Sequence, residues 1–232
     1  RHSLGGGVAS PPAPRASLVL PRAMTRLARR RALAVPLFAA IAVAFTSPLF
    51  ARPMHLGHGD WLWFHFTWDS ARRTLLEFRG LPWWNPYYCG GNLGIANPQS
   101  LALSPLYLLL LPLQTAPAMK AYLGLSTFLG LWGTYELCRR NFGRGPFTVI
   151  AAVTFACSGT LGWHMNGQTA MCAFHLLPWV LYGFFRGAEP GQGRWSLLGG
   201  GAMATMVLSG GVYPTLVSGV TVTVTFLLAA LV

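Results

Sequence analysis

Long runs of hydrophobic residues, separated by short basic or glycine-rich segments, follow one another along most of the chain. A helix needs about 20 mainly apolar residues to cross the hydrocarbon core of a bilayer. The runs therefore predict an all-α, polytopic transmembrane protein, with spans at 32–51, 116–138, 146–163, 170–185, 195–209 and 212–232. A further run at 101–113, interrupted by Pro105 and Pro112, is too short to cross and predicts a re-entrant or interfacial segment.

The segment 52–100, between the first two predicted spans, has a different pattern. Over 60–79 the aromatic and aliphatic residues recur near helical spacing, while most charged residues occupy other positions. This pattern predicts an amphipathic helix that lies at a membrane interface, with its tryptophans at headgroup depth. The remainder, 81–100, contains several prolines and glycines and predicts an ordered loop that is not helical.

The two ends of the chain differ from the rest. Residues 1–23 are rich in Gly, Pro, Ala and Ser and predict a disordered or non-native extension, so we expect the transmembrane domain to cover 24–232. The basic stretch after Met24, followed by an apolar run, also resembles a signal peptide. However, 32–51 has spanning length and no clear A-x-A cleavage site, which favours an uncleaved helix. Because an apolar run continues to Val232, we expect the N-terminal part of a longer protein, truncated at 232.

Composition and charge support a membrane protein with a defined orientation. The chain is 53% hydrophobic and 9% charged, with a formal net charge of +12, whereas soluble domains are about 25% charged. The basic residues form short clusters between apolar runs, as the positive-inside rule requires, and this pattern does not indicate nucleic-acid binding. Alternating spans place every cluster in the cytoplasm and the loop 52–100 outside. The clusters are Arg26, Arg29, Arg30 and Arg31; Arg139, Arg140 and Arg144; and Arg186 and Arg194.

Asp60 is the first candidate for chemistry, since the sequence contains no P-loop, GxSxG, HExxH or C-x-x-C motif. It lies on the external side, just before the predicted amphipathic helix. A carboxylate there can accept a proton from an acceptor hydroxyl. It can also hold a divalent metal such as Mg²⁺ or Mn²⁺ with His58, although the string H-x-x-H-x-D at 55–60 is not a specific metal motif. The alternative is an N-cap, where Asp accepts hydrogen bonds from free backbone N–H groups.

Other polar residues also have structural alternatives. Asp69 with Arg72 or Arg73 is predicted to form a surface pair at i,i+3 or i,i+4 spacing. His164, Asn166 and Gln168 in the turn 164–169 can line a sugar or phosphate pocket, or the turn can simply join two spans. His175, inside a predicted span, can be functional or can bond a backbone carbonyl near a helix end.

Several short motifs follow one another in a fixed order. They are L-P-W-W-N-P-Y at 81–87, G-G-N-L-G at 90–94, N-P-Q-S at 97–100, F-A-C-S-G at 155–159, L-P-W at 177–179 and G-G-V-Y-P at 210–214. The first external loop opens with an acid and continues as an amphipathic helix. Together with this loop, the motifs make residues 32–232 resemble the N-terminal part of YfhO-type bacterial membrane proteins, which are grouped with the GT-C glycosyltransferases. The W-N-P-Y, G-G and P-Q-S motifs are the specific part of this resemblance.

The resemblance implies a GT-C-like enzyme of the bacterial cytoplasmic membrane, with its N-terminus in the cytoplasm. Such an enzyme moves a sugar from a polyprenyl-phosphate-linked donor to a cell-envelope glycan, lipid or protein outside the cytoplasm. In GT-C enzymes the first external loop carries an essential acid, and Asp60 matches that position. Asn97 departs from the family, whose members often have Asp before P-Q-S. If that acid assists metal or donor binding, metal dependence or substrate would differ in this chain.

The expected site combines these candidates. Asp60 is the catalytic candidate and, with His58, the candidate metal ligand. The leaving group would be a lipid phosphate, whose charge needs a cation or a metal; Arg72, Arg73, Arg79 and Lys120 are the external-side candidates. The loop aromatics can stack on a sugar or anchor the loop among lipid headgroups, and we favour anchoring. Candidate substrate-binding residues are Arg72, Arg73, Trp84, Asn85, Tyr87, Asn97, Gln99 and His164.

A non-catalytic function is the alternative. The chain would then be a membrane scaffold, or a transporter component that handles lipid-linked glycans without transferring sugar. The predicted spans contain few acidic residues, which disfavours an ion-coupled transporter.

Overall fold

The computed structural model of the chain describes residues 22–57 and 59–231, which are mostly helical. The expected extension at 1–23 therefore lies almost entirely outside the described residues. In chain order the elements are α1 (Arg22–Phe50), α2 (Trp61–Leu76), β1 (Trp84–Asn85), β2 (Asn92–Leu93), α3 (Pro105–Leu110), α4 (Thr115–Phe142), α5 (Pro146–Ala156), α6 (Gly159–His164), the 3-10 helix η1 (Thr169–Leu176), α7 (Leu177–Gly187), α8 (Trp195–Leu208) and α9 (Val212–Ala230).

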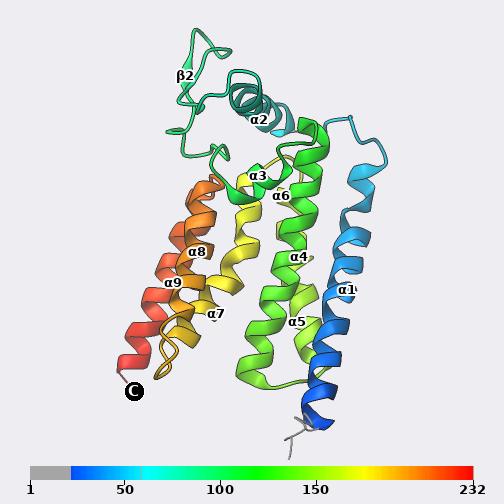
Figure 1. Cartoon of the computed structure of the whole chain (residues 1–232), viewed down its shortest axis with the longest axis vertical. Coiled ribbons are helices and arrows are strands. Elements are labelled where there is room, and N and C mark those ends of the chain that lie inside the picture. Colours follow the sequence, from blue (N-terminus) through cyan, green and yellow to red (C-terminus); the bar gives the residue numbers. More distant parts are fainter. Residues whose placement is uncertain (1–21, 58, 232) are drawn as a thin grey trace, which may run out of the picture.

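The long helices form an elongated bundle in which α4 is central (Figure 1). On one side α4 packs against α1 and α5, and on the other it packs against η1 and α7, which in turn contact α8 and α9. Glycines allow this close approach. A Cβ atom on Gly130 would lie 2.6 Å from the ring of His175, and one on Gly133 would lie 2.7 Å from the ring of Trp179. Small residues of this kind let neighbouring helix backbones come close together.

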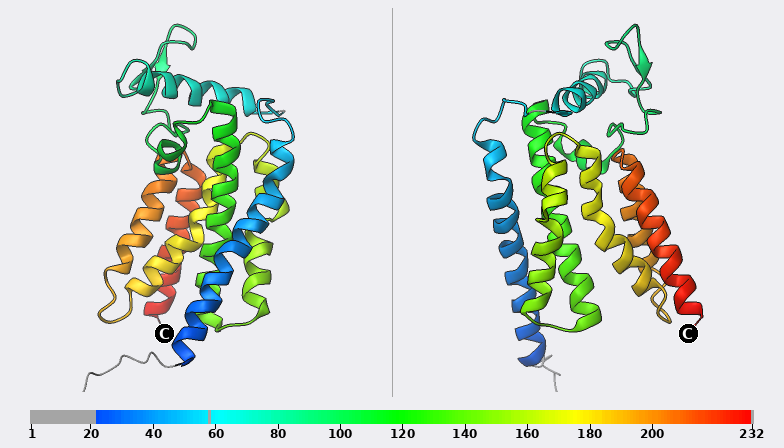
Figure 2. Two further views of the ribbon diagram at one scale, coloured as in Figure 1. Left: turned by 45° about the vertical axis from the view of Figure 1, so that its right-hand side comes forward. Right: turned by 180° about the vertical axis from the view of Figure 1, so that it is seen from behind.

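α2 lies across one end of the bundle, and the short antiparallel pair β1–β2 lies beyond it (Figures 1 and 2). The buried apolar residues of α2 are Trp61, Phe64, Trp68 and Ala71, whose spacing of three and four positions defines one helical face. Trp68 contacts the rings of Tyr107 and Tyr122 edge-on, at centroid distances of 4.9 and 5.4 Å. The apolar face of this amphipathic helix thus packs on protein at the end of the bundle.

Two of the predicted spans are broken helices. The segment predicted at 146–163 is interrupted at Cys157 and Ser158, where the Ser158 hydroxyl accepts a hydrogen bond from the N–H of Leu161 and starts α6. The segment predicted at 170–185 begins as the 3-10 helix η1 and continues as α7 from Leu177. The ring nitrogens of His175 lie 2.9 Å from the carbonyl oxygen of Cys172 and 3.1 Å from that of Ala156. His175 therefore contacts the carbonyl oxygen that the end of α5 exposes.

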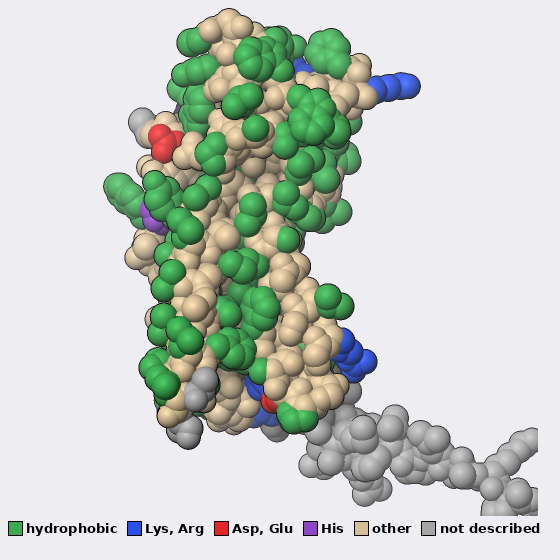
Figure 3. Space-filling view, turned by 90° about the vertical axis from the view of Figure 1, so that its left-hand side faces the viewer, with side chains coloured by type: hydrophobic (Ala, Val, Ile, Leu, Met, Phe, Trp, Pro, Cys, Tyr) green, Lys and Arg blue, Asp and Glu red, His purple; other side chains and the backbone are tan. Residues whose placement is uncertain are grey.

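Three helical stretches among the described residues are long and apolar enough to cross a membrane, namely Leu33–Phe50, Pro146–His164 and Val212–Ala229. The apolar helix Trp195–Leu208 is shorter. α9 exposes a stripe of apolar side chains on the flank seen in Figure 3, where hydrophobic groups occur along the whole face and Lys and Arg lie toward its ends. The stripe includes Val212, Leu216, Val220, Val224 and Leu227.

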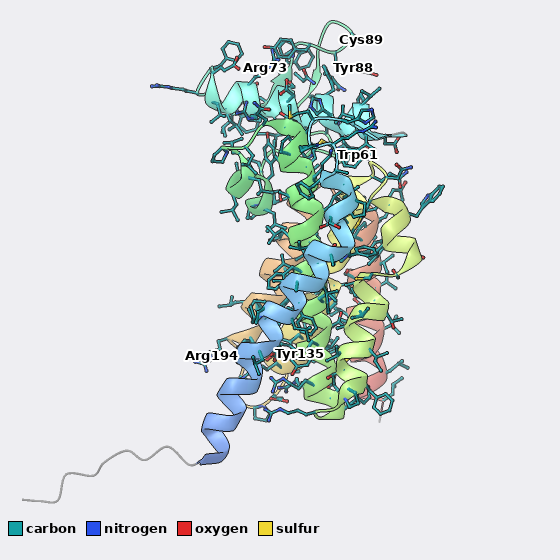
Figure 4. The ribbon with its side chains drawn as sticks, turned by 90° about the vertical axis from the view of Figure 1, so that its right-hand side faces the viewer. Trp61, Arg73, Tyr88, Cys89, Tyr135 and Arg194 are labelled. Atoms are coloured by element: carbon teal, nitrogen blue, oxygen red, sulfur yellow. The ribbon has the colours of Figure 1, made fainter. Side chains whose placement is uncertain are left out.

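Charged residues lie at both ends of the bundle. At the end opposite α2, Arg139 pairs with Glu136 and Arg140 pairs with Glu189. Arg194 and Tyr135 lie toward that end, while Trp61, Arg73, Tyr88 and Cys89 lie at the α2 end (Figure 4). All residues of the predicted external loop that the structure describes therefore lie together at the end of the bundle that α2 covers.

Candidate active site

Asp60 stands at the start of α2 and is exposed. Its backbone carbonyl accepts a hydrogen bond from the N–H of Phe64 at 3.0 Å, as expected for an N-cap residue. Its carboxylate, however, makes no capping hydrogen bond to α2. The interpretation of this side chain as a helix cap is therefore wrong, and the carboxylate is available to other partners.

The partner of the Asp60 carboxylate is Gln168, from the turn between α6 and η1. Nε2 of Gln168 donates to Oδ2 of Asp60 at 3.1 Å. Because an ionised carboxylate only accepts hydrogen bonds, the amide nitrogen must face Asp60 and the amide oxygen must face away. That oxygen lies 2.6 Å from Nδ1 of His164, which must carry the proton and donate it. A carboxylate, a carboxamide and an imidazole are thus connected in a row.

Gly167 allows the turn to approach the start of α2. It has a φ of +107°, and a Cβ atom there would lie 2.5 Å from the nitrogen of Trp61 and 2.9 Å from the carbonyl carbon of Asp60. Any other residue would be strained by its φ and would collide with backbone atoms. The hydrogen-bonded row of Asp60, Gln168 and His164 therefore depends on Gly167, which is not itself a member of the row.

Asp60 lines a cavity of about 380 Å³ at this end of the bundle. The cavity lies between the start of α2, the N-P-Q loop, the turn before η1 and the start of α9. Its polar side chains are those of Asp60, Gln168, Asn97, Gln99 and Tyr213. The structure therefore brings together three predicted site residues, Asp60, Asn97 and Gln99, and adds His164 through its hydrogen bond to Gln168.

The wall formed by α9 and the N-P-Q loop also depends on a glycine. Gly210 has a φ of +70°, and a Cβ atom on it would lie 2.6 Å from the carbonyl carbon of Gln99. The loop itself is closed by Asn97, whose Oδ1 accepts a hydrogen bond from the backbone N–H of Gln99 at 2.9 Å. An Asp side chain at this position can accept the same bond, so an exchange of Asn97 for Asp would change the charge of the cavity and not the shape of the turn.

An apolar cavity of about 310 Å³ adjoins the first one. The two share Asn97, Pro98 and Val212 in their linings. The second cavity lies between the loop 95–103, the end of α8 and the start of α9, and its lining is mostly aliphatic. The aliphatic lining residues are Ile95, Leu103, Val207, Leu208, Val212 and Leu216. A cavity with one carboxylate in its lining thus neighbours a mostly aliphatic cavity beside α8 and α9.

The remaining predicted residues of α2 do not line either cavity. Arg72 donates to the backbone carbonyl of Leu113 at 2.9 Å, which ties α2 to the end of the short α3 segment. Arg73 pairs with Asp69 at 2.8 Å, which confirms the predicted i,i+4 surface pair. Asp69 also accepts a hydrogen bond from the Thr115 hydroxyl at the start of α4, at 2.7 Å. Arg72 and Asp69 therefore attach α2 to the rest of the protein, whereas Arg73 makes its ion pair within α2.

The predicted aromatic loop residues lie apart from Asp60 as well. Asn85 is buried, and its Oδ1 accepts a hydrogen bond from the backbone N–H of Tyr87 at 3.1 Å. The indole ring of Trp84 packs against Gly91 so closely that a Cβ atom on Gly91 would collide with it. The side chains of Trp84 and Tyr87 are about half exposed. The hairpin that carries them projects beyond α2, on the side away from the bundle (Figure 2).

The sequence prediction missed Phe64 and Tyr213 as parts of the site, and it placed Gln168 in a turn that can line a pocket without linking it to Asp60. Gln168 belongs to the turn whose polar character the sequence shows, but nothing local indicates that its partner is Asp60, 108 positions away. Tyr213 sits in the G-G-V-Y-P motif, which marks it as part of a distinctive turn and gives no sign of the cavity it lines.

For a metal ion, the described lining of the Asp60 cavity supplies one carboxylate. No group of three or more His, Cys, Asp or Glu side chains in 22–57 and 59–231 could hold a metal ion. His58, the predicted partner of Asp60 in metal binding, lies outside the described residues. Asn97, Gln99 and Gln168 add carboxamides to the single carboxylate, and oxygen donors of this kind suit Mg²⁺.

Comparison of the chain with protein-family models, curated proteins and solved structures found no match.

Proposed function

We propose that this protein is a membrane glycosyltransferase of the GT-C type, which uses a polyprenyl-phosphate-linked sugar and a cell-envelope acceptor. The observation that carries the proposal is the pair of neighbouring cavities, one with Asp60 and several carboxamide side chains in its lining and one with a mostly aliphatic lining. A lipid-linked sugar has the same division, since its sugar phosphate is polar and its polyprenyl chain is apolar. The chain would lie in the apolar groove and the sugar beside Asp60.

The proposed setting is a bacterial cytoplasmic membrane, with the α2 end outside. Three helical stretches have the length and composition of membrane spans, and we propose that α4, the η1–α7 segment and α8 cross with them. Arginines at the opposite end then face the cytoplasm, in agreement with the positive-inside rule. In this orientation the Asp60 cavity lies near the outer surface, where a lipid-linked donor and an envelope acceptor can both reach it.

In the proposed reaction Asp60 acts as the general base. Its carboxylate takes the proton of the acceptor hydroxyl, whose oxygen attacks C1 of the sugar while the bond from C1 to the lipid phosphate oxygen breaks. The amide of Gln168 holds Oδ2, and His164 fixes the amide in the orientation that donates to Asp60. No hydrogen bond to Oδ1 of Asp60 occurs among the described residues, so that oxygen is free to meet the hydroxyl.

The test is sugar transfer in membranes that contain the protein, with labelled polyprenyl-phosphate sugars as donors. Asp60→Asn removes the base and keeps the shape of the side chain, and we expect transfer to fall by about 100-fold or more, as for the loss of a general base. The matched control is Glu77→Gln, which removes the same charge from the exposed far end of α2. Transfer by Asp60→Asn at the rate of the Glu77→Gln variant, at equal protein abundance, would contradict the proposed role.

The non-catalytic alternative also has one supporting observation. Among the described residues that line the Asp60 cavity, Asp60 is the only one with an ionisable carboxylate, thiol, amine or imidazole side chain. A chamber with a single such group can hold a lipid-linked glycan without cleaving it. This alternative predicts that wild-type protein retains labelled donor on purification, releases it unchanged and transfers no sugar to any acceptor.

A further inference from the structure

A separate cavity of about 380 Å³ lies beyond the contact between Gly167 and the start of α2. It is formed by the end of α1, the loop that follows, α4 and the turn after α6. Asn166 lines this cavity, whereas Gln168, two positions later, lines the Asp60 cavity. Asp60 itself is absent from the lining, and three basic residues, Arg52, His55 and Lys120, are present.

Lys120 is the unusual member of this group. It is 3% exposed, yet it borders the cavity from within α4. Its ammonium donates to the carbonyl of Arg52 at 2.6 Å and to that of His55 at 2.8 Å. An ammonium carries three donors, so these two bonds leave one for another partner.

No carboxylate compensates this buried charge among the residues that the structure describes. All five acids of the chain are engaged or placed elsewhere. Asp60 accepts from Gln168, Asp69 pairs with Arg73, Glu136 and Glu189 pair with arginines at the opposite end, and Glu77 is exposed at the end of α2. A buried ion normally has a partner of opposite charge, because leaving water without one is costly. The two carbonyls supply only dipoles.

We propose that this cavity binds a phosphate group, with the ammonium of Lys120 at its base and the Arg52 side chain at its rim. The guanidinium of an arginine matches the oxygens of a phosphate with paired donors, and a lysine adds a point charge. The apolar residues Pro48 and Leu49 at the end of α1 form the adjacent wall, so the phosphate can be free or can be the headgroup of a lipid lying along α1. The inference rests on Lys120 and its cavity and does not require sugar transfer at Asp60.

The test uses the purified whole chain in a neutral detergent free of phosphate, with thermal unfolding followed by tryptophan fluorescence. Inorganic phosphate is titrated against sodium chloride and sodium acetate at matched ionic strength. In a second series the micelles contain phosphatidic acid, or diacylglycerol as the uncharged control. We expect a saturable rise in the unfolding temperature with phosphate, with phosphatidic acid, or with both. A rise with phosphatidic acid alone identifies a lipid headgroup as the source of the phosphate.

Variants separate the cavity from general charge effects. Arg52→Gln should weaken phosphate binding by about tenfold, as expected when a bond to a charged group is lost. Arg194→Gln removes the same charge at the opposite end of the bundle and should bind as wild type. Because Lys120→Gln can impair folding, Arg52→Gln carries the test. No rise with either phosphate probe, an equal rise with acetate, or equal binding by the Arg52→Gln and Arg194→Gln variants would overturn the proposal.

Discussion

The geometry around Asp60 depends on the absence of a side chain at Gly167. An alanine there would be strained by the φ of +107° and would press on the backbone of Asp60 and Trp61. Gly167→Ala is therefore expected to destabilise the protein by about 3 kcal/mol, combining the cost of a left-handed residue with that of an overpacked contact. Chemical unfolding followed by tryptophan fluorescence measures this difference.

Gly143 provides the control for that substitution. Its φ is +79°, but a Cβ atom on it would meet nothing within 4 Å. Gly143→Ala should therefore cost only the backbone strain, without the overpacked contact, and destabilise the protein less than Gly167→Ala. Equal losses of stability in the two variants would show that the turn does not press on the start of α2.

Asp60 shows how far single residues can be interpreted without a structure. Its position after an apolar run and before an amphipathic pattern marked it for chemistry, and the same position suggested a helix cap. The structure separates the two, because the backbone of Asp60 begins α2 while its carboxylate accepts from Gln168. A local pattern cannot make this distinction, since the competing hydrogen-bond donor comes from another part of the chain.

His65 makes the attachment of α2 sensitive to pH. Burial lowers the pKa of His65 below its ordinary value of 6.5, and nearby Asp69 opposes this shift only in part. The folded protein therefore binds this proton less readily than the unfolded chain. Above pH 6.5 the ring is neutral in both the folded and the unfolded chain, and the free energy of unfolding is not reduced by this group. Stability is lost as the pH falls from 6.5 through the lower pKa of the folded state, because the unfolded chain then binds the proton more readily.

We accordingly expect the free energy of unfolding to decrease as the pH is lowered from about 7 to about 5, through the range where histidines titrate. His65→Gln, which cannot take up the proton, should flatten this decrease. Denaturant unfolding of both proteins at several pH values measures the difference in slope. An unchanged slope in the variant would assign the pH dependence to other groups.

The broken helices could not be predicted from hydropathy. The runs at 146–163 and 170–185 are apolar throughout, so a pattern of hydrophobic residues predicts continuous helices there. The break at Ser158 is stabilised by its own cap. It is also stabilised by His175, which contacts the carbonyl of Ala156 from another element. The place where a backbone group loses its helical partner depends on whether a distant side chain can replace it.

The arrangement of the whole molecule predicts which cysteines face outward. Cys89 is exposed in the loop beyond α2, whereas Cys138 is partly buried near the opposite end of α4. If the α2 end is external, a membrane-impermeant maleimide should label Cys89 in right-side-out vesicles. Cys89→Ser should abolish that labelling. Labelling of Cys89 only in inside-out vesicles would reverse the proposed orientation.

The helical character of the chain was accessible from sequence, because a helix makes its backbone hydrogen bonds within one segment and its apolar pattern is local. The same holds for the amphipathic α2, whose buried face follows the predicted spacing from Trp61 to Trp68. The contacts that define the candidate sites required the tertiary structure. They join Asp60 to Gln168, Arg72 to the carbonyl of Leu113, and Lys120 to the carbonyls of Arg52 and His55. Each of these contacts joins positions far apart in the chain, so the partner is decided by how closely the two backbones approach. At the Asp60 site Gly167 permits that close approach, because it has no side chain.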